Sequence, residues 1–537
     1  MRLNRADLEN KIFWQQAGFE IPGFDIGEIA CNTTNEPSWI HFGAGNIFRG
    51  FLAPLQQKLL DEGKTDKGII AVAPYDHESI EQIYKPCENL TILVHMLPDG
   101  SLEKRIIGSV AESLTGDTLR TDDWKRLREL FCKPSLQMAS FTVTEKGYVL
   151  TNMSDEFLPD VKDDIENGPD RPKAFISKLA SLLYERHVSG NLPIALVSMD
   201  NCSHNGDLLR KSLLILVSNW VKKGFVHKAY LDYINDPQKV SFPCTMIDKI
   251  TPRPSEEIKK MLEELGIDDI KIICTQKKTY LSQFVNAEKP QYLVIEDWFP
   301  NGRPPLEHAG VYFTDKLTVE KAEKMKVATC LNPLHTALAI FGCLLGYTLI
   351  ADEMKDTCLK RLVEKIGYDE GMPVVADPGI INPGEFIDEV INRRLPNPYI
   401  RDTPQRIACD TSQKIPVRFG ETIKTYFKHP TLEAKNLTYI PLVIAGWFRY
   451  LMGTDDLGNE MELSPDPMLN ELRNHFKNVQ PGNTVAAGDC IKPLLSNGRI
   501  FGMDLYKAGM ANKIEGLFLE MLSGKNAVRN VLEKYVI

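Results

Sequence analysis

The chain has no excess of basic residues. Its 537 residues include 63 Lys and Arg against 72 Asp and Glu, which gives a formal net charge of −9. Nucleic-acid binding needs clustered Lys and Arg, so nucleic acid is excluded as a bulk partner. The 11 cysteines form no CxxC pair, and neither a zinc ribbon nor a disulfide framework is expected. We therefore expect a reduced, cytoplasmic chain without a bound metal.

Long apolar runs are also missing. The N-terminal segment "MRLNRADLENKIFWQQ" mixes charges and has no apolar centre, so we expect no signal peptide. The most apolar run, residues 336–351, has about 16 residues, whereas ~20 are needed to span a bilayer. This run predicts a buried core helix and no membrane partner.

The patterns that are present predict an α/β chain with two domains. Residues 38–76 alternate between a strand, a glycine turn, a helix and a second strand. The apolar runs in "LQMASFTVTEKGY" and "LPIALVSMDN" predict further buried parallel strands with polar residues at their carboxyl ends. Beyond "NGRPPLEHAG" the patterns are mostly helical. We expect an α/β nucleotide-type domain over residues 1–300 and a mainly α-helical domain over residues 301–537.

A glycine turn follows the first strand of this unit and opens a helix. It consists of Gly43, Ala44, Gly45, Asn46, Ile47, Phe48 and Arg49. Gly43 permits a tight turn, and Gly45 allows the backbone to approach a pyrophosphate at the helix N-terminus. The third glycine of the usual fingerprint is absent, since Phe48 occupies its place, while Arg49 would add a cation. A dinucleotide site is predicted, with a plain strand–helix turn as the alternative.

Asp76 follows the second strand of the same unit. An acid at this place accepts hydrogen bonds from an adenosine ribose and disfavours a 2′-phosphate, which favours NAD over NADP. The alternative is that Asp76 caps the next helix, which begins in "HESIEQIY". Both interpretations stay open on the sequence.

Three polar or constrained residues open the apolar run of the second domain. Asn332 is a good N-cap and Pro333 is favoured at the first helical position, so a purely local explanation exists. His335 would then lie in the first turn, where a structural role is the alternative to a catalytic one. Lys326 lies just upstream, and a solvated surface charge is the alternative to an acid/base role.

Seven longer motifs follow one another along the chain. They are "HFGAGNIFRGF", "TVTEKGY", "VSMDNCSHNG", "FPCTMIDKITP", "VIEDWFPNGRPPLEHAGV", "LNPLHTAL" and "RDTPQRIACDTSQKIP". By these motifs, the chain resembles the mannitol dehydrogenase family from about Trp39 to past Lys414. The resemblance implies a Rossmann-like domain followed by a helical domain similar to that of 6-phosphogluconate dehydrogenase. It also implies metal-independent hydride transfer between a nicotinamide cofactor and a sugar carbinol or ketone.

The family's catalytic pattern is a Lys, an Asn five residues later and a His three beyond that. Asn332 and His335 match this Asn and His, but position 327, where the Lys would fall, is Val327. Lys326 is one residue early, which would rotate it by about 100° on a regular helix. The break at Pro333, or a π-bulge upstream of it, would absorb the extra residue. We therefore assign the acid/base role to Lys326.

The resemblance carries further residues over. Asn201 matches a second active-site asparagine, with an Asx turn as the local alternative. Asp248 matches an acid near the reaction centre. Arg406 and Lys414 match a substrate-binding pair, although by themselves they are ordinary solvated cations. Thr144 and Glu145 belong to a loop beside the cofactor.

The resemblance also implies how these residues act. Lys326 would donate a proton to the reduced ketone oxygen, while Asn201 and Asn332 would hold that oxygen and His335 would bind substrate or orient the site. The hexuronate branch is favoured, with D-fructuronate reduced to D-mannonate by NADH. The alternatives are a tagaturonate reductase, a mannitol or polyol 2-dehydrogenase, and a non-catalytic sugar- or nucleotide-binding relic. We expect a monomer or a small homo-oligomer.

Overall fold

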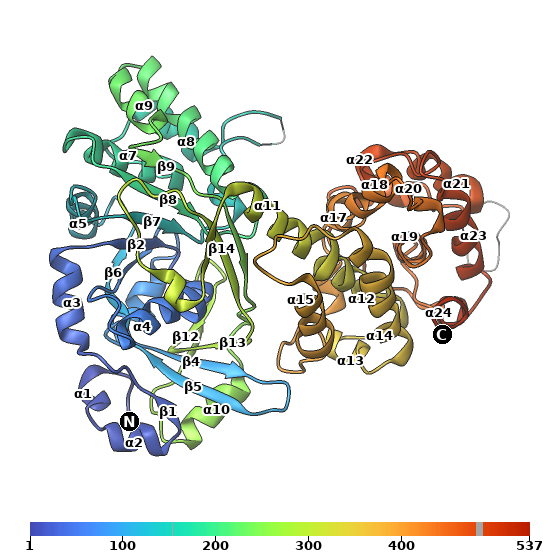
Figure 1. Cartoon of the computed structure of the whole chain (residues 1–537), viewed down its shortest axis with the longest axis horizontal. Helices are drawn as coiled ribbons and strands as arrows, with labels where there is room; N and C mark the ends of the chain where they lie inside the picture. Colours follow the sequence, from blue (N-terminus) through green and yellow to red (C-terminus); the bar gives the residue numbers. More distant parts are fainter. Residues whose placement is uncertain (153, 480–486) are drawn as a thin grey trace. The chain divides into compact units, whose positions relative to one another are not determined.

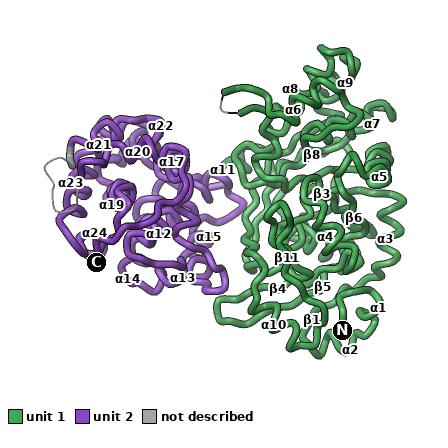
Figure 2. The backbone as a smooth tube through the Cα atoms, turned by 180° about the vertical axis from the view of Figure 1, so that it is seen from behind, with its two compact units in different colours: residues 1–320 green, residues 321–537 purple. Residues whose placement is uncertain are grey.

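The computed structural model describes residues 1–152, 154–479 and 487–537. The chain forms two compact units, Met1–Glu320 and Lys321–Ile537, which Figure 2 colours separately. The division falls within helix α11 (Lys316–Met325), whereas the boundary expected from the sequence lies between residues 300 and 301.

The first unit is built on a six-stranded parallel sheet in the order β6-β3-β2-β7-β8-β9 (Figure 1). Its strands in chain order are β2 (Trp39–Phe42), β3 (Ile69–Ala73), β6 (Val110–Thr115), β7 (Met138–Phe141), β8 (Ile194–Ser198) and β9 (Val240–Ser241). Counted within the sheet, this order is 3-2-1-4-5-6, the doubly wound dinucleotide-binding arrangement. The strand order reverses between β2 and β7, so a ligand is expected beyond the carboxyl ends of these two strands.

Both faces of this sheet are buried, which explains the continuous apolar runs of its strands. Alternate strand residues face opposite sides: Ile40, Phe42, Ile70 and Val72 lie in the core that also holds α5, α7 and α8. Trp39, Ile69, Ala71 and Ala73 lie in the core that holds η1 and α4.

The helical elements of the first unit are α1 (Arg5–Leu8), α2 (Lys11–Gln16), α3 (Ile26–Asn35), η1 (Phe48–Leu52), α4 (Ala53–Asp61), η2 (Ile80–Tyr84), α5 (Thr121–Phe131), η3 (Glu145–Gly147), α6 (Pro159–Asn167), α7 (Phe175–Val188), α8 (Asn205–Lys222), α9 (Lys228–Asn235), α10 (Glu256–Glu264) and η4 (Leu306–Ala309).

Three smaller sheets accompany the parallel one, in the orders β1-β5-β4-β13, β10-β14-β15 and β11-β12. These sheets were not predicted from the sequence, and three of their six strand pairings, β1 with β5, β10 with β14 and β13 with β4, join strands remote in the chain. Their strands are β1 (Phe19–Glu20), β4 (Thr91–Met96), β5 (Leu102–Ile107), β10 (Thr245–Asp248), β11 (Ile272–Cys274), β12 (Tyr280–Ser282), β13 (Phe284–Ala287), β14 (Tyr292–Glu296) and β15 (Tyr312–Thr314).

The second unit is helical in its described residues, as its sequence pattern predicts. Its elements are η5 (Lys326–Cys330), α12 (Asn332–Leu345), α13 (Ile350–Glu353), α14 (Thr357–Glu364), η6 (Lys365–Gly371), η7 (Met372–Val374), α15 (Pro383–Glu389), η8 (Val390–Arg394), α16 (Pro404–Ile407), α17 (Thr411–Arg418), α18 (Gly420–Lys428), η9 (Ala434–Asn436), α19 (Tyr439–Leu451), α20 (Leu469–Asn474), α21 (Ala487–Leu495), α22 (Gly498–Phe501), α23 (Ala511–Met521) and α24 (Ala527–Val536). The buried helices α12 and α19 form its centre. They pack closely at Gly446, where an added Cβ would lie 2.7 Å from the Phe341 ring.

The apolar run at residues 336–351 lies largely in α12, and the predicted core helix is confirmed. One helical stretch of the described residues, Lys316–Leu345, is long and apolar enough to cross a membrane by length and composition. However, 83% of its most apolar window is buried within the structure, as in the core helix of a globular domain. The fold class expected from the sequence is likewise confirmed.

Candidate active site

The glycine turn joins β2 to η1, at the point where the strand order reverses. Gly43 has φ +127°, and a Cβ there would lie 2.4 Å from the Thr142 carbonyl oxygen, so only glycine fits. A Cβ on Gly45 would meet no atom within 4 Å. The two glycines thus differ: Gly43 is required by the fold, while Gly45 borders open space into which a ligand can come close to the backbone.

The absent third glycine has a structural explanation. Phe48 is fully buried and its ring stacks on His41 with centroids 4.5 Å apart, within the π turn η1. Arg49 is also buried; its Nε donates to Thr91 Oγ1 at 3.1 Å, and its guanidinium lies 5.7 Å from the Tyr84 ring centroid. Both side chains therefore lie in the interior of the unit. Any contact that Phe48 makes with a cofactor would involve its backbone.

The hairpin of β11 and β12 contacts the glycine turn and Asp76. Asn46 Nδ2 donates to the Tyr280 carbonyl at 3.1 Å, and Thr275 Oγ1 donates to Asp76 Oδ2 at 2.7 Å. The amide oxygen of Asn46, Oδ1, and the other carboxylate oxygen of Asp76, Oδ1, are buried and have no hydrogen-bond partner among the described residues. Two unpartnered acceptors beside an open glycine suit the hydroxyl groups of a ribose.

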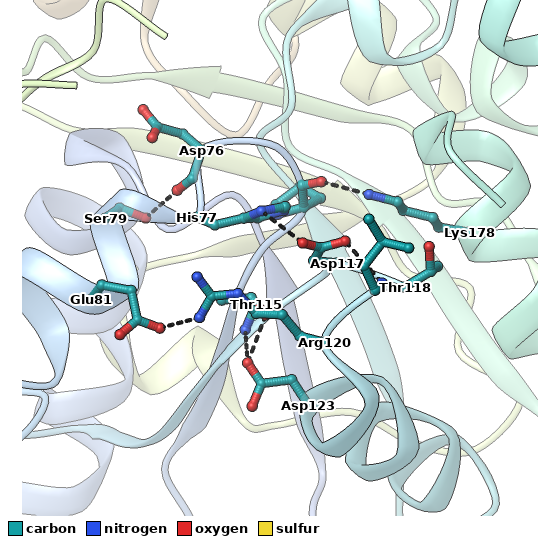
Figure 3. Close-up of polar contacts among 12 residues, drawn as sticks. Asp76, His77, Ser79, Glu81, Thr115, Asp117, Thr118, Arg120, Asp123 and Lys178 are labelled. Carbon is teal, nitrogen blue, oxygen red and sulfur yellow. Dashed lines mark hydrogen bonds and ion pairs between the residues drawn. The ribbon is translucent and has the colours of Figure 1, made fainter. Parts of the chain in front are cut away.

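Asp76 does not cap a helix through its side chain. The Ser79 hydroxyl donates to the Asp76 backbone carbonyl at 2.7 Å, and Figure 3 shows the Asp76 carboxylate pointing away from the other polar groups drawn. Those groups hold the chain just beyond β3 and β6: Lys178 Nζ donates to the Pro74 carbonyl at 3.0 Å, and His77 Nδ1 lies 3.5 Å from an Asp117 carboxylate oxygen. This cluster fixes the loop that carries Asp76 without using its carboxylate, of which Oδ2 is bonded to Thr275 and Oδ1 has no partner among the described residues.

The loop after β7 is held by a residue that the sequence analysis missed. Asp200, just beyond β8, accepts from the backbone N–H of Val143 at 3.1 Å and of Thr144 at 2.7 Å, and also from the Tyr148 hydroxyl. Burial raises the pKa of Asp200, although these hydrogen bonds oppose the shift. Thr144 has φ +67°, and both Thr144 and its neighbour Glu145 are exposed. The loop is therefore rigidly anchored while its tip is accessible at the cofactor edge of the sheet.

Asn201 and Asp248 lie on adjacent segments of the first unit. Asn201 is exposed and follows Asp200 directly, while Asp248 ends β10 and is buried. Asn205 links the two segments, because its Nδ2 donates to Thr245 Oγ1 at 2.9 Å and its Oδ1 accepts from the Thr245 N–H at 2.9 Å. These bonds fix the chain that carries each residue.

Lys326 begins a π turn, η5, in the second unit. The Leu331 N–H donates to the Lys326 carbonyl, five residues earlier, at 3.1 Å. A π turn holds one residue more than an α turn, so the extra residue between Lys326 and Asn332 is accommodated here, as one of the two predicted routes required. The Lys326 side chain is buried, with 1% of its surface exposed. It is not the solvated surface charge of the alternative interpretation.

Asn332 does not cap α12, which corrects the local explanation given above. The helix begins at Asn332 itself, the N-cap position is Leu331, and no side chain caps this end. Pro333 lies within the first two helical positions, where its missing N–H costs nothing. The half-buried amide of Asn332 is consequently not used in capping the helix.

His335, Asp402 and Arg406 form one cluster. His335 Nε2 lies 3.3 Å from an Asp402 carboxylate oxygen, and Arg406 Nε donates to the same carboxylate at 2.6 Å. Burial lowers the pKa of His335, and Asp402 only partly offsets that shift. The pKa of Asp402 is lowered, because its bonds to His335 and Arg406 outweigh the opposing effect of burial. A neutral imidazole held by an ionised carboxylate is thus favoured near neutral pH.

Two further cations lie on α17 beside this cluster. Lys414 Nζ donates to the carbonyl oxygens of Ile407 at 3.1 Å and of Cys409, and burial lowers its pKa. Arg418 Nη1 donates to Thr336 Oγ1 at 2.6 Å, on the first turns of α12. Neither Asp402 nor Arg418 was predicted as a site residue from the sequence. The one sequence feature that could have indicated them is their position: Asp402 lies within the motif that contains Arg406 and Lys414, and Arg418 lies just beyond it.

The predicted residues thus fall into two groups. The first unit brings together the glycine turn, Asp76 and the Thr144 loop around the switch point of the sheet. In the second unit, η5 packs against α12 and α17, which places Lys326 on the same bundle of helices as Asn332, His335 and Lys414. The described residues contain no group of three or more His, Cys, Asp or Glu side chains that could hold a metal ion.

Comparison with known proteins finds a relative over the whole chain. The D-mannonate oxidoreductase of Thermotoga maritima is 55% identical, over 100% of this chain and 99% of the relative. The D-mannonate oxidoreductase of Escherichia coli is 28% identical, over 87% of this chain and 91% of the relative. The solved ternary complex of Pseudomonas fluorescens mannitol 2-dehydrogenase with NAD and D-mannitol superposes with a TM-score of 0.73 at 25% identity, covering 99% of both chains.

Two family descriptions account for most of the sequence. Residues 37–308 match the mannitol dehydrogenase Rossmann domain, and residues 318–521 match the mannitol dehydrogenase C-terminal domain. Together with the sheet order and the helical second unit, these matches establish that the chain belongs to the mannitol dehydrogenase family.

Proposed function

We propose that this member of the mannitol dehydrogenase family is an NAD-dependent secondary alcohol dehydrogenase that interconverts D-fructuronate and D-mannonate. The observation that carries the proposal is the 55% identity, over the full chain, to a D-mannonate oxidoreductase. The solved mannitol 2-dehydrogenase that shares the fold was crystallised with NAD and D-mannitol, which supports the same cofactor and reaction type.

The residues around the switch point of the sheet fit a nicotinamide dinucleotide. Gly43 and Gly45 would bring the backbone to the pyrophosphate, and the unpartnered Asp76 Oδ1 would accept from the adenosine ribose. A carboxylate at that place disfavours a 2′-phosphate, which supports NAD over NADP. When bound, NADH supplies the hydride.

Lys326 is the proposed acid/base. As hydride reaches the ketone carbon, negative charge develops on its oxygen, and the Lys326 ammonium would donate a proton there. Burial lowers the pKa of a lysine side chain toward neutrality, where it can both donate and accept a proton. Only 1% of the Lys326 surface is exposed. The side-chain amide of Asn332, which does not cap α12, would donate to the same oxygen. The roles assigned to Asn201, Asp248, Thr144 and Glu145 stay predictions.

His335, Arg406 and Lys414 would bind the substrate's hydroxyl and carboxylate groups. The shared Asp402 would orient His335 and Arg406 through its two short contacts. Because Arg406, Lys414 and Arg418 lie near one another while Asp402 is paired with Arg406, this region favours an anionic substrate over a neutral one.

A substrate panel tests the proposal. NADH oxidation would be followed with D-fructuronate, D-tagaturonate and D-fructose, and repeated with NADPH and with EDTA. We expect rapid turnover of D-fructuronate with NADH, unaffected by EDTA. Faster turnover of tagaturonate or fructose would replace the substrate assignment, and NADH binding without any turnover would favour a non-catalytic relic.

A further inference from the structure

The three cations Arg406, Lys414 and Arg418 of the second unit differ in whether a carboxylate is paired with them. Arg406 shares the Asp402 carboxylate through two of its nitrogens, and its own side chain is 67% exposed. Lys414 donates to two backbone carbonyls, which orient the ammonium without neutralising it. The charge of Arg406 is therefore paired with Asp402, whereas the hydrogen bonds of Lys414 are to neutral groups.

Arg418 has a neutral partner. Its Nη1 donates to Thr336 Oγ1 at 2.6 Å, and Thr336 Oγ1 in turn donates to the Asn332 carbonyl at 2.9 Å. No carboxylate among the described residues forms an ion pair with Arg418. Burial lowers the pKa of Arg418 to about 10, and its positive charge contributes to the lowered pKa of His335. Arg418 is thus a partly buried cation that bonds to a neutral hydroxyl beside the proposed reaction centre.

We infer that Arg418 is a specificity-determining residue that binds the carboxylate of an acidic sugar substrate. This inference rests on the proposed function and extends it to a residue outside the Arg406 and Lys414 pair. A partly buried charge without a counterion is unfavourable, and an arriving carboxylate would relieve that cost. A guanidinium carries five N–H donors, of which one is used on Thr336, so a two-point contact with a carboxylate remains open.

The bond to Thr336 makes this contact relevant to chemistry. Through Thr336, Arg418 is tied to the turn of α12 that carries Asn332 and His335. A carboxylate held by Arg418 is therefore placed at a fixed offset from those two residues. A neutral sugar offers a hydroxyl at the same carbon, which hydrogen-bonds but leaves the guanidinium charge unbalanced.

D-Fructuronate and D-fructose provide a matched pair, because they differ only in a terminal carboxylate against a hydroxymethyl group. We would measure kcat and KM for both substrates with wild type, Arg418→Gln and Arg418→Lys. The exposed Arg473 supplies the control variant Arg473→Gln, which removes the same charge elsewhere in the second unit. Thermal unfolding of each variant reports whether the fold is intact.

Arg418→Gln is expected to lower kcat/KM for D-fructuronate by about 30- to 100-fold, mainly through KM, since hydrogen bonds to charged groups are worth this much. The value for D-fructose should change by less than about threefold. Arg418→Lys keeps the charge but loses the two-point contact, so an intermediate loss on the uronate is expected. Arg473→Gln should match wild type on both substrates.

Equal losses on both substrates, or no loss on either, would overturn the inference and leave Arg418 a structural residue. If fructose turnover is too slow to measure, the effects on KM and kcat for D-fructuronate decide. A raised KM for D-fructuronate, with kcat and the KM for NADH little changed, supports the inference. A fall in kcat alone overturns it. If Arg418→Gln does not fold, the uronate selectivity of Arg418→Lys decides in the same way. A wild-type enzyme silent on D-fructuronate would refute the proposed function itself, and the inference with it.

Discussion

The Leu331 N–H donates to the Lys326 carbonyl at 3.1 Å, across five residues instead of the four of an α-helix. This bond defines the π turn between the proposed acid/base and Asn332. The family pattern places its lysine five residues before the asparagine, and here the separation is six. The π turn accommodates the additional residue while α12 keeps its register. The six-residue separation is therefore compatible with the assignment of Lys326 as the acid/base.

Deletion of Val327 tests this explanation. Val327 is the least buried residue of the turn after Lys326, and its removal would restore the family spacing on an ordinary α turn. We expect the variant to keep at least about a tenth of the wild-type kcat. An alanine inserted at the same place rotates Lys326 by about 100° and should reduce kcat by more than about 100-fold. A deletion as damaging as the insertion would contradict the compensating role of the π turn.

Asp402→Asn tests the coupling between His335 and Arg406. The Asp402 carboxylate raises the pKa of His335 against the stronger lowering by burial. Removing its charge should therefore lower the pKa of His335 further. We expect kcat/KM to fall by about 10- to 100-fold, as for other partners that orient a functional histidine, and any acid limb of the pH profile set by His335 to move to lower pH. Asp402→Glu should recover part of the activity, and an acid limb that moves upward would contradict the assignment.

Gly43 and Gly45 should respond differently to alanine. Gly43→Ala forces a Cβ to 2.4 Å from the Thr142 carbonyl at φ +127°, so we expect a loss of about 2 kcal/mol or more in stability. Gly45→Ala meets no protein atom within 4 Å. It should leave the melting temperature unchanged while raising the Kd for NADH by about tenfold or more. Normal NADH affinity in Gly45→Ala would argue against a cofactor at this turn.

Glu353 should make stability depend on pH. Its side chain is fully buried, neither oxygen has a hydrogen-bond partner in the described structure, and burial raises its pKa to about 9. The folded state therefore binds more protons than the unfolded state between the usual carboxyl pKa of about 4.5 and about 9. Stability contributed by this group is fully present below that window and falls by up to about 1.4 kcal/mol per pH unit as pH rises through it.

Glu353→Gln removes this titration. Relative to wild type, the variant should gain about 4 kcal/mol between pH 5 and pH 8, measured by chemical denaturation. The fixed cost of burying an amide is the same at both pH values and does not affect the difference. Parallel pH profiles for the two proteins would show that Glu353 does not titrate as its burial requires.

Local sequence patterns predicted what depends on neighbouring residues. Buried apolar strands with polar exits predicted the parallel sheet, and the glycine spacing predicted the strand–helix turn that lies at its switch point. Asn332 shows the limit of such reasoning: Asn-Pro is a good cap signal, but the π turn upstream starts the helix one residue early. The contact between Asp76 and Thr275 joins residues 199 positions apart, and no local pattern encodes it. Asp402 and Arg418 were missed for the same reason, since their importance arises from the residues that α12, α16 and α17 bring together.

The most direct test of the account is NADH oxidation with D-fructuronate by wild type, Lys326→Ala and Lys324→Ala. Lys324 is a matched control, because it is exposed and its ion pair to Glu421 is 3.3 Å long. The account predicts that Lys326→Ala loses about 10²- to 10⁴-fold in kcat while its Kd for NADH stays at the wild-type value, and that Lys324→Ala remains fully active. Near-normal turnover by Lys326→Ala would contradict the account.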